Sequence, residues 1–290
     1  MCGQLSRKVW VPEHMNSELE RLKEDGISFL QGGVGDTFVL LHGIPGSASS
    51  WEKTGLLLKD QFHVIIPDLL GFGESDLPRG DYYLTQQANS LHELLADLGI
   101  TSAYIAGHDF GGPVALTMMR LFPEFEVKGL ILSDTNVFTD TFIPIPPRMA
   151  RVPLLATPFF KMMAGNLLGM RMMYQQAFVN KSDNSWHTFK THLTKGGMEY
   201  TAKIFQRSLA DLKGNYGEIE EMLPGIDVPT LVLWGAKDPF FPVSVGHRTQ
   251  GAIKNSILKI YPETGHFVPE ERSAEVAQDI IDFVDSGRAL

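Results

Sequence analysis

The sequence predicts an α/β fold in which a mostly parallel β-sheet is flanked by helices. Short runs of Val, Ile, Leu, Phe and Tyr alternate with helix-length amphipathic stretches, which is the pattern of parallel strands joined by helical crossovers. The runs are nearly uninterrupted in apolar residues, which favours strands that are buried on both faces of a sheet. With 43% hydrophobic residues in 290, the chain can bury a large core.

The individual elements follow in order along the chain. Two short runs at 9–11 and 27–30 are interpreted as a pair of antiparallel edge strands. The nearly continuous apolar runs predict six further strands, at 37–41, 62–67, 103–107, 129–133, 229–234 and 256–261. Apolar residues at helical spacing predict helices at 84–98, 112–121 and 274–284.

The alternation of strands and helices stops between Asn136 and Gly225, where Met, Phe, Arg and Lys become frequent. We interpret residues 136–225 as an inserted helical cap, and residues 1–135 and 226–290 as the core domain. The beginning of the insertion is rich in proline, which disfavours regular helix: Pro144, Pro146, Pro147, Pro153 and Pro158. A methionine cluster suits a variable substrate cavity, although methionine at helical spacing is more often plain core: Met162, Met163, Met170, Met172 and Met173.

Charge and cysteine content exclude several classes of protein. The 25 Lys and Arg against 34 Asp and Glu give a net charge of −9, which argues against a nucleic-acid partner. Cys2 is the single cysteine, so there is no internal disulfide, and a reducing cytoplasm is expected. No run reaches about 18 consecutive apolar residues, so no membrane-spanning helix is expected. The first thirty residues contain acidic residues and Pro12 where a signal peptide would have an apolar segment, so no signal peptide is expected.

The strongest local signal is Gly107-His108-Asp109-Phe110-Gly111, where a predicted strand passes into a predicted helix. Small residues on both sides of Asp109 are typical of a nucleophile elbow, a strained turn that projects its central side chain above the sheet. The centre of such turns is usually Ser. An Asp carboxylate instead displaces a leaving group from carbon and forms an alkyl ester. The alternative is a tight turn with a helix-capping Asp.

Two further residues fall where such a nucleophile needs partners. His266 follows the last predicted strand, so it shares the carboxyl edge of the sheet with Asp109 and is the candidate general base. Asp238 follows the preceding strand and can accept the imidazole Nδ1 hydrogen. The alternatives are an incidental loop histidine and an Asp-Pro turn. The chain order of nucleophile, acid and histidine is the one expected for this architecture.

The loop Leu41-His42-Gly43-Ile44-Pro45 follows the first strong parallel strand. Its Ile44 amide, together with the Phe110 amide, is expected to form the oxyanion hole for ester hydrolysis. We assign a different group of residues to loop geometry rather than catalysis: Asp68, Gly71 and Gly73.

Four motifs in this order resemble the α/β-hydrolase superfamily: His42-Gly43-x-Pro45, Gly107-His108-Asp109-x-Gly111-Gly112, Trp234-Gly235-x-x-Asp238 and Gly265-His266. The resemblance spans roughly residues 38–284 and lies with the Asp-nucleophile branch, which holds epoxide hydrolases and haloalkane dehalogenases. It implies an eight-stranded, mostly parallel sheet, a helical lid over the active site, and neither a metal nor an organic cofactor.

The resemblance to epoxide hydrolases implies that lid tyrosines protonate the epoxide oxygen. Tyr216 near the end of the cap best matches the second tyrosine of that family. Tyr174 is the candidate for the first, and Tyr200 is the alternative. Each of these tyrosines could instead be a packing aromatic.

The resemblance to haloalkane dehalogenases implies donors around a leaving halide. Phe110 stands where these enzymes carry Trp, and Ile44 stands where many carry Asn, so both donors are absent. Trp186 is one remaining candidate, although packing is the simpler interpretation. Fluoroacetate-type relatives carry arginines after the elbow, where this chain has Pro113 and Val114.

The sequence is therefore interpreted as a cytoplasmic hydrolase, with epoxides as the leading substrates and haloalkanes as the alternative. A non-catalytic small-molecule binding protein on the same fold is a third reading. The expected partners are a small apolar organic substrate and water, and homodimer formation stays open. Asp134 and Asn136 follow the strand at 129–133, where some relatives carry the acid that partners the histidine.

Overall fold

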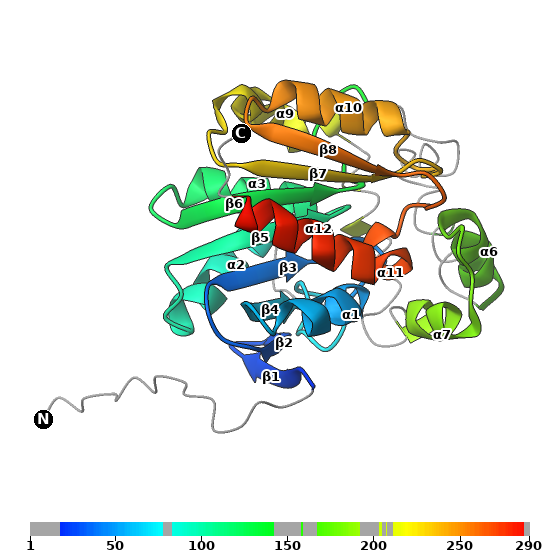
Figure 1. Ribbon diagram of the computed structural model, residues 1–290, viewed down its shortest axis with the longest axis horizontal. Coiled ribbons are helices and arrows are strands. Elements are labelled where there is room, and N and C mark those ends of the chain that lie inside the picture. The colour runs from blue at the N-terminus through cyan, green and yellow to red at the C-terminus, as the bar shows by residue number, and fades with distance from the viewer. Residues whose placement is uncertain are drawn as a thin grey trace, which may run out of the picture.

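An eight-stranded sheet forms the centre of the protein (Figure 1). The computed structural model describes residues 18–77, 83–141, 158, 167–191, 203–204, 207 and 211–286. The strands are β1 (Glu20–Glu24), β2 (Ile27–Gly32), β3 (Thr37–Leu41), β4 (His63–Pro67), β5 (Ser102–His108), β6 (Glu126–Ser133), β7 (Thr230–Gly235) and β8 (Ser256–Tyr261). Their spatial order is β1-β2-β4-β3-β5-β6-β7-β8. The pairings of β2 with β1 and β4 are antiparallel and the others are parallel, which confirms the expected sheet.

The edge of the sheet differs from the prediction in one strand. The run at 27–30 lies in β2, as expected, and the six parallel strands match the predicted runs to within a few residues. The strand at the edge beside β2, however, is β1, whereas the run at 9–11 lies outside the described residues. β1 has the sequence ERLKE, and its charged residues are exposed. A charged edge strand has no apolar run that could reveal it, and its charges protect the edge from further pairing.

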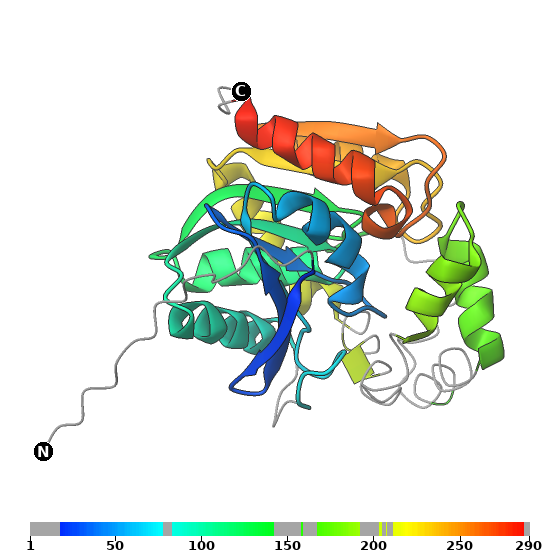
Figure 2. The same ribbon diagram turned by 60° about the horizontal axis from the view of Figure 1, so that its bottom comes forward.

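Helices cover both faces of the sheet (Figures 1 and 2). One face carries α1 (Ser49–Leu58), α11 (Val268–Glu271) and α12 (Ser273–Asp285), and the other carries α2 (Leu84–Asp97), α3 (Gly111–Leu121) and α10 (Val243–Ala252). The three predicted helices correspond to α2, α3 and α12. Among the helices that the sequence patterns missed, α10 buries a Gly and a Thr, and α1 buries Trp51 and Leu58 together with Ser, Thr and Gly. Apolar residues therefore rarely recur at helical spacing in either helix.

Two apolar cores result, one on each face of the sheet. Consecutive side chains of β3 alternate between them: Val39 and Leu41 pack with α2 and α3, whereas Phe38 and Leu40 pack with α1 and α12. Burial on both faces is thus confirmed for the central strands. The same prediction is wrong for β8. This strand lies at one edge of the sheet, and its Ile257 is 38% exposed.

The chain between β6 and β7 contains α6 (Leu167–Ala177), α7 (Asp183–Thr191), α9 (Leu212–Met222) and the short 3₁₀ helix η1 (Leu223–Gly225). Figure 1 shows α6 and α7 beyond the carboxyl ends of the parallel strands. In contrast, α9 packs against the core, where Tyr216 and Ile219 join the cluster that contains α3. Several residues that the sequence singles out lie outside the described part of the chain: Cys2, Pro144, Pro146, Pro147, Pro153, Met162, Met163 and Tyr200.

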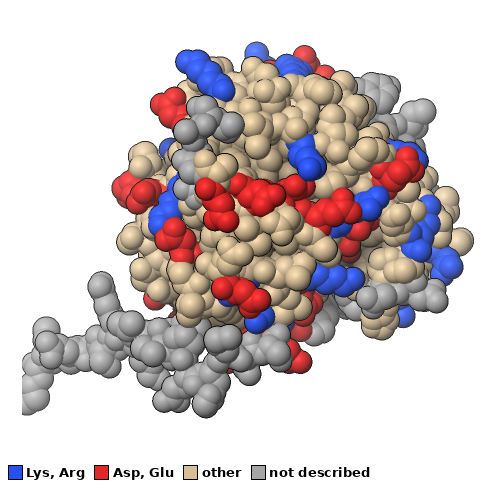
Figure 3. Space-filling model, viewed as in Figure 1, with Lys and Arg blue, Asp and Glu red and all other residues tan. Residues whose placement is uncertain are grey.

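Acidic side chains gather on the face of the molecule that Figure 3 shows, over α12. This helix carries Glu275, Asp279, Asp282 and Asp285, and Lys259 of the adjacent β8 pairs with Asp279 at 3.1 Å. In the ranges that the structure describes, no helix is both long enough and apolar enough to cross a bilayer.

Candidate active site

Asp109 lies in the sharp turn between β5 and α3, at the carboxyl edge of the sheet. Its φ angle is 48°, in the left-handed region that few residues other than glycine adopt. A Cβ atom on Gly107 would lie 2.5 Å from backbone atoms of Gly111, so the turn closes only with glycine there. The Asp109 amide donates to the Ser133 carbonyl at 3.1 Å, and the Thr135 hydroxyl donates to the Asp109 carbonyl at 2.6 Å. The strained turn is therefore fixed to the neighbouring end of β6.

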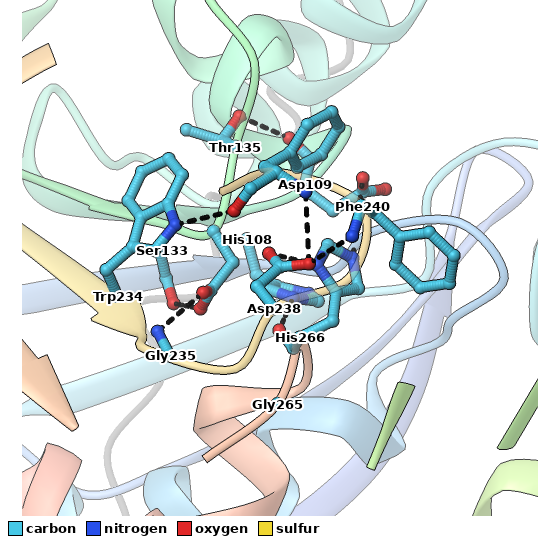
Figure 4. Close-up of polar contacts among 12 residues, drawn as sticks. His108, Asp109, Ser133, Thr135, Trp234, Gly235, Asp238, Phe240, Gly265 and His266 are labelled. Atoms are coloured by element: carbon cyan, nitrogen blue, oxygen red, sulfur yellow. Dashed lines mark hydrogen bonds and ion pairs between the residues drawn. The ribbon is translucent and has the colours of Figure 1, made fainter. Parts of the chain in front are cut away.

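His266 and Asp238 meet Asp109 at this edge (Figure 4). His266 lies between β8 and α11, and Asp238 follows β7. The His266 Nδ1 atom is 2.8 Å from Asp238 Oδ2, and its Nε2 atom is 3.6 Å from Asp109 Oδ2. The amides of Phe240 and Phe241 donate to Asp238 Oδ1, at 2.7 and 3.1 Å. Asp238 is thus held in place to receive the Nδ1 hydrogen, and the Nε2 side of the ring faces Asp109.

Three titratable groups around the turn have shifted pKa values. Burial raises the pKa of Asp109, but the hydrogen bond and the charge of His266 outweigh burial and bring that pKa below its ordinary value. Burial lowers the pKa of His266, but the charge of Asp238 and the hydrogen bonds to both acids raise it well above its ordinary value. Burial and the charge of His266 lower the pKa of His108 to about 3. The resting site therefore holds a carboxylate beside an imidazolium, with a neutral histidine behind them.

This arrangement makes the pKa of His266 dependent on the charge of Asp109. We expect the pKa of His266 to be lower in the Asp109→Ala variant than in the wild type, because one of the two negative charges that raise it is removed. An NMR titration of the imidazole resonances, with His247→Gln to remove an exposed histidine signal, measures the change. An unchanged or higher pKa would contradict the assigned pairing.

The loop after β3 supplies a donor to the nucleophile. The Ile44 amide donates to Asp109 Oδ1 at 2.7 Å, and there is no room for a Cβ on Gly43 beside the Asp109 side chain. His42 holds this loop, because its Nδ1–H donates to the Gly43 carbonyl at 2.8 Å while its Nε2 accepts from the Leu69 amide at 3.0 Å. The two Asp109 oxygens therefore differ: Oδ1 is held by an amide and Oδ2 faces His266. The other expected donor, the Phe110 amide, directly follows Asp109 at the beginning of α3.

The candidate tyrosines lie in different surroundings. Tyr216 on α9 is buried, and its hydroxyl accepts a hydrogen bond from the Tyr83 hydroxyl at 3.4 Å. The Tyr83 ring lies 5.9 Å from the ring of Phe110, the residue after the nucleophile. Sequence reasoning missed Tyr83, which lies just before α2 and has no motif around it. The fold therefore pairs Tyr216 with a phenol of the core rather than with Tyr174.

Tyr174 is bound within the inserted helices. Its hydroxyl lies 2.6 Å from the Ser185 hydroxyl and donates to the Ser182 carbonyl at 3.1 Å. Its ring packs 5.4 Å from the ring of Trp186, over which Arg171 also lies. These contacts join α6 to α7. Neither Tyr174 nor Trp186 contacts Asp109 or His266 through them.

Asp134, the alternative partner acid, is fully buried behind the site. Its Oδ1 accepts from the Gly235 amide at 2.8 Å, and its Oδ2 accepts from the Ser133 hydroxyl at 2.9 Å. Burial and the charge of Asp238 raise the pKa of Asp134 well above its ordinary value. His266 Nδ1 donates its hydrogen bond to Asp238, so the geometry favours Asp238 as the relay acid.

Two other polar residues of the sequence analysis close loops. Asp68 Oδ1 accepts from the Ala48 amide at 2.6 Å, and its Oδ2 pairs with Arg21 at 2.7 Å and accepts from the Glu74 amide at 3.0 Å. Asn136 donates to the carbonyl of Phe138 at 3.0 Å. Within the described ranges, no three His, Cys, Asp or Glu side chains come together as metal ligands.

Comparisons with known proteins agree with this architecture. The sequence profile of the alpha/beta hydrolase fold matches residues 36–273. Human epoxide hydrolase 4 is 26% identical over 270 residues, which cover 87% of this chain and 74% of that protein. Lipase 1 of Psychrobacter immobilis is 30% identical over 254 residues, which cover 85% of this chain and 76% of the lipase. Haloalkane dehalogenase DbeA from Bradyrhizobium elkani USDA94 shares the fold, with a TM-score of 0.79 and 19% identity over 93% of this chain and 98% of its own.

Proposed function

The chain belongs to the alpha/beta hydrolase fold family, and from that premise we propose that it hydrolyses small apolar epoxides through an ester on Asp109. One observation carries the proposal: Asp109 occupies the elbow, with Oδ1 2.7 Å from the Ile44 amide and Oδ2 3.6 Å from His266 Nε2. An oxygen held by an amide is suited to become the ester carbonyl, and the other oxygen is suited to attack.

The first step forms the ester. Asp109 Oδ2 attacks an epoxide carbon, and the C–O bond of the ring breaks with its electron pair going to oxygen. That oxygen takes the phenolic proton of Tyr216 and becomes a hydroxyl group. Since the ester on Asp109 is uncharged, the pKa of His266 falls, and the imidazolium returns a proton to the Tyr216 phenolate. His266 is then neutral and can act as a base.

The second step hydrolyses the ester. His266 takes a proton from water, and the resulting hydroxide adds to Asp109 Cγ. The negative charge develops on Oδ1, which the amides of Ile44 and Phe110 stabilise. The intermediate collapses, the alkoxide of the product takes the carboxylic proton, and a vicinal diol leaves. Asp109 is again a carboxylate beside the His266 imidazolium, which Asp238 stabilises through Nδ1.

A carboxylate nucleophile favours a different reaction from a serine nucleophile. A serine hydroxyl attacks an ester carbonyl and gives an acyl-enzyme ester that water can hydrolyse. A carboxylate attacking the same carbonyl would give an anhydride, whereas at a saturated carbon it gives an ester. Asp109 in the nucleophile position therefore favours a substrate with an electrophilic saturated carbon.

Among such substrates, the surroundings of Asp109 favour an epoxide over a haloalkane. Phe110 and Ile44 have no side-chain donors for a halide, and Trp186 packs within the inserted helices. The buried hydroxyl pair of Tyr83 and Tyr216 offers the acid that an epoxide oxygen requires. The likeness to human epoxide hydrolase 4 agrees with this choice.

We also assign residues 136–225 to a cap domain over the site. The support is the position of α6 and α7 beyond the carboxyl ends of the strands, and an apolar cluster in which Tyr174, Phe178 and Phe189 pack with Phe267, the neighbour of His266. On this assignment, the inserted helices and the histidine loop together shape the binding site.

A paired assay tests the proposed reaction. We expect the purified protein to convert a styrene-type epoxide to its diol faster than it releases bromide from a bromoalkane of similar size. Tyr216→Phe should slow diol formation by about 10²-fold, because it removes the acid for the epoxide oxygen. Faster release of bromide would make the protein a dehalogenase. Binding of both compounds without turnover would make it a binding protein.

A further inference from the structure

The carboxylate of Glu271, at the end of α11, joins two segments that are distant in sequence. Its Oε1 accepts a hydrogen bond from the Gly265 amide at 2.8 Å, on the loop that carries His266. Its Oε2 accepts from the amides of Val179 and Asn180, at 3.0 and 2.7 Å, and from Asn180 Nδ2 at 3.1 Å. Val179 and Asn180 follow α6 of the inserted region after one intervening residue. One side chain thus ties the histidine loop to that region.

The backbone of His266 is part of the same junction. Its amide donates to the Ala177 carbonyl at the end of α6, at 2.8 Å, and its carbonyl accepts from His108 Nε2 at 2.9 Å. A Cβ on Gly265 would collide with the Ala177 carbonyl, so the segments approach as closely as two backbones can. The Phe267 ring stacks 4.8 Å from the ring of Phe178. The position of the imidazole therefore depends on how α6 is seated.

The junction is polar and half-buried, and its donors suit a carboxylate. Four N–H donors converge on the two oxygens of Glu271, and a carboxylate is the side chain that accepts all of them without offering a donor. Burial raises the pKa of Glu271 because it destabilises the charged carboxylate. The hydrogen bonds from the N–H groups stabilise the carboxylate and partly offset this effect. The catalytic steps above make no use of this charge, so the contacts themselves are its role.

We propose that Glu271 is a positioning residue for the ester-hydrolysis step, in which it holds His266 by tying the Gly265 amide to the segment after α6. This inference rests on the proposed function. Asp109 is held by its own turn and by the Ile44 amide, so alkylation does not depend on the junction. Water activation does depend on it, because the base must lie within hydrogen-bonding reach of a water at the ester.

Glu271→Gln tests this separation of the two steps. An amide keeps the size of the side chain but has a single acceptor oxygen. Three of the four donors lie at the Oε2 position, so the amide oxygen is expected there and the NH₂ group would oppose the Gly265 N–H. The variant should therefore lose the link to the His266 loop and keep the link to α6.

Rapid quenching after mixing with styrene oxide, followed by intact-protein mass spectrometry, gives the rates of ester formation and ester loss. For Glu271→Gln we expect ester loss to slow by about 10- to 10²-fold, as for a slightly misplaced catalytic group, with ester formation within about twofold of wild type. Glu275→Gln is the matched control, since the Glu275 side chain on α12 is 58% exposed and pairs with Arg272, the residue before that helix. It should behave as wild type in both steps.

Four results would count against the inference. Ester loss at the wild-type rate in Glu271→Gln, or equal slowing of both steps, would overturn the positioning role. If Glu271→Gln does not fold, Asn180→Ala removes one donor to the same carboxylate, and unchanged ester loss there, instead of an expected slowing of about 5-fold, would overturn it as well. Absence of any ester in His266→Gln would overturn the proposed function, and the inference with it.

Discussion

Asp109→Ala is expected to abolish turnover, with kcat falling on the order of 10⁶-fold, the scale on which hydrolases lose activity without their nucleophile. The carboxylate is the group that forms the covalent bond, and the neighbouring imidazole cannot replace it. His266 Nε2 lies 3.6 Å from Asp109 Oδ2, where it can act on water but does not form the ester. Diol formation measured by chromatography, with the uncatalysed hydrolysis subtracted, provides the rate.

The control for this variant must share its backbone strain. Asp25, in the exposed turn between β1 and β2, has a φ angle of 42°, close to the 48° of Asp109. Alanine costs about 1 kcal/mol in this region, so Asp25→Ala should lose similar stability in thermal unfolding and keep full activity. Loss of activity in both variants would assign the effect of Asp109→Ala to the strained turn instead of the missing nucleophile.

His266→Gln is expected to stop the reaction halfway. Glutamine cannot take a proton from water, so ester loss should slow by up to about 10⁴-fold, the contribution of a general base. Alkylation needs the Asp109 carboxylate and should continue, so the protein should gain the mass of one epoxide. Intact-protein mass spectrometry and peptide mapping to Asp109 would detect the adduct.

His247→Gln on α10 is the matched control, because His247 is exposed on a helix of the core. It should form no lasting adduct and should release diol at the wild-type rate. Rapid steady turnover by His266→Gln would show that another group activates water, and the assignment of the base would then be wrong.

The residues whose meeting the sequence predicted follow parallel strands. Gly107 and Gly111 mark the turn around Asp109 in a stretch of five residues, and His266 and Asp238 come directly after the apolar runs of β8 and β7. Since parallel strands end at a common edge, their meeting could be predicted from chain order alone. Short-range patterns are sufficient for these residues because the sheet brings the strand ends together.

The side-chain contacts that the sequence could not predict join core segments to the inserted region, between residues that are far apart in the sequence. The hydroxyls of Tyr83 and Tyr216 meet across 133 positions, and Glu271 meets Val179 across 92. Nothing in the neighbourhood of these residues indicates a partner, because the packing of the inserted helices decides it. The pairing of β1 with β2 is short in sequence but was missed for another reason, because it depends on backbone hydrogen bonds and not on an apolar pattern.

The central claim is that the Asp109 carboxylate forms the covalent bond, and turnover in ¹⁸O-labelled water tests it most directly. In a single turnover, the diol should carry an unlabelled oxygen from Asp109, and the heavy isotope should appear in the peptide that contains Asp109. This follows because water attacks Cγ of the ester and not the carbon of the substrate. Label found in the diol, with Asp109 unlabelled, would contradict the account.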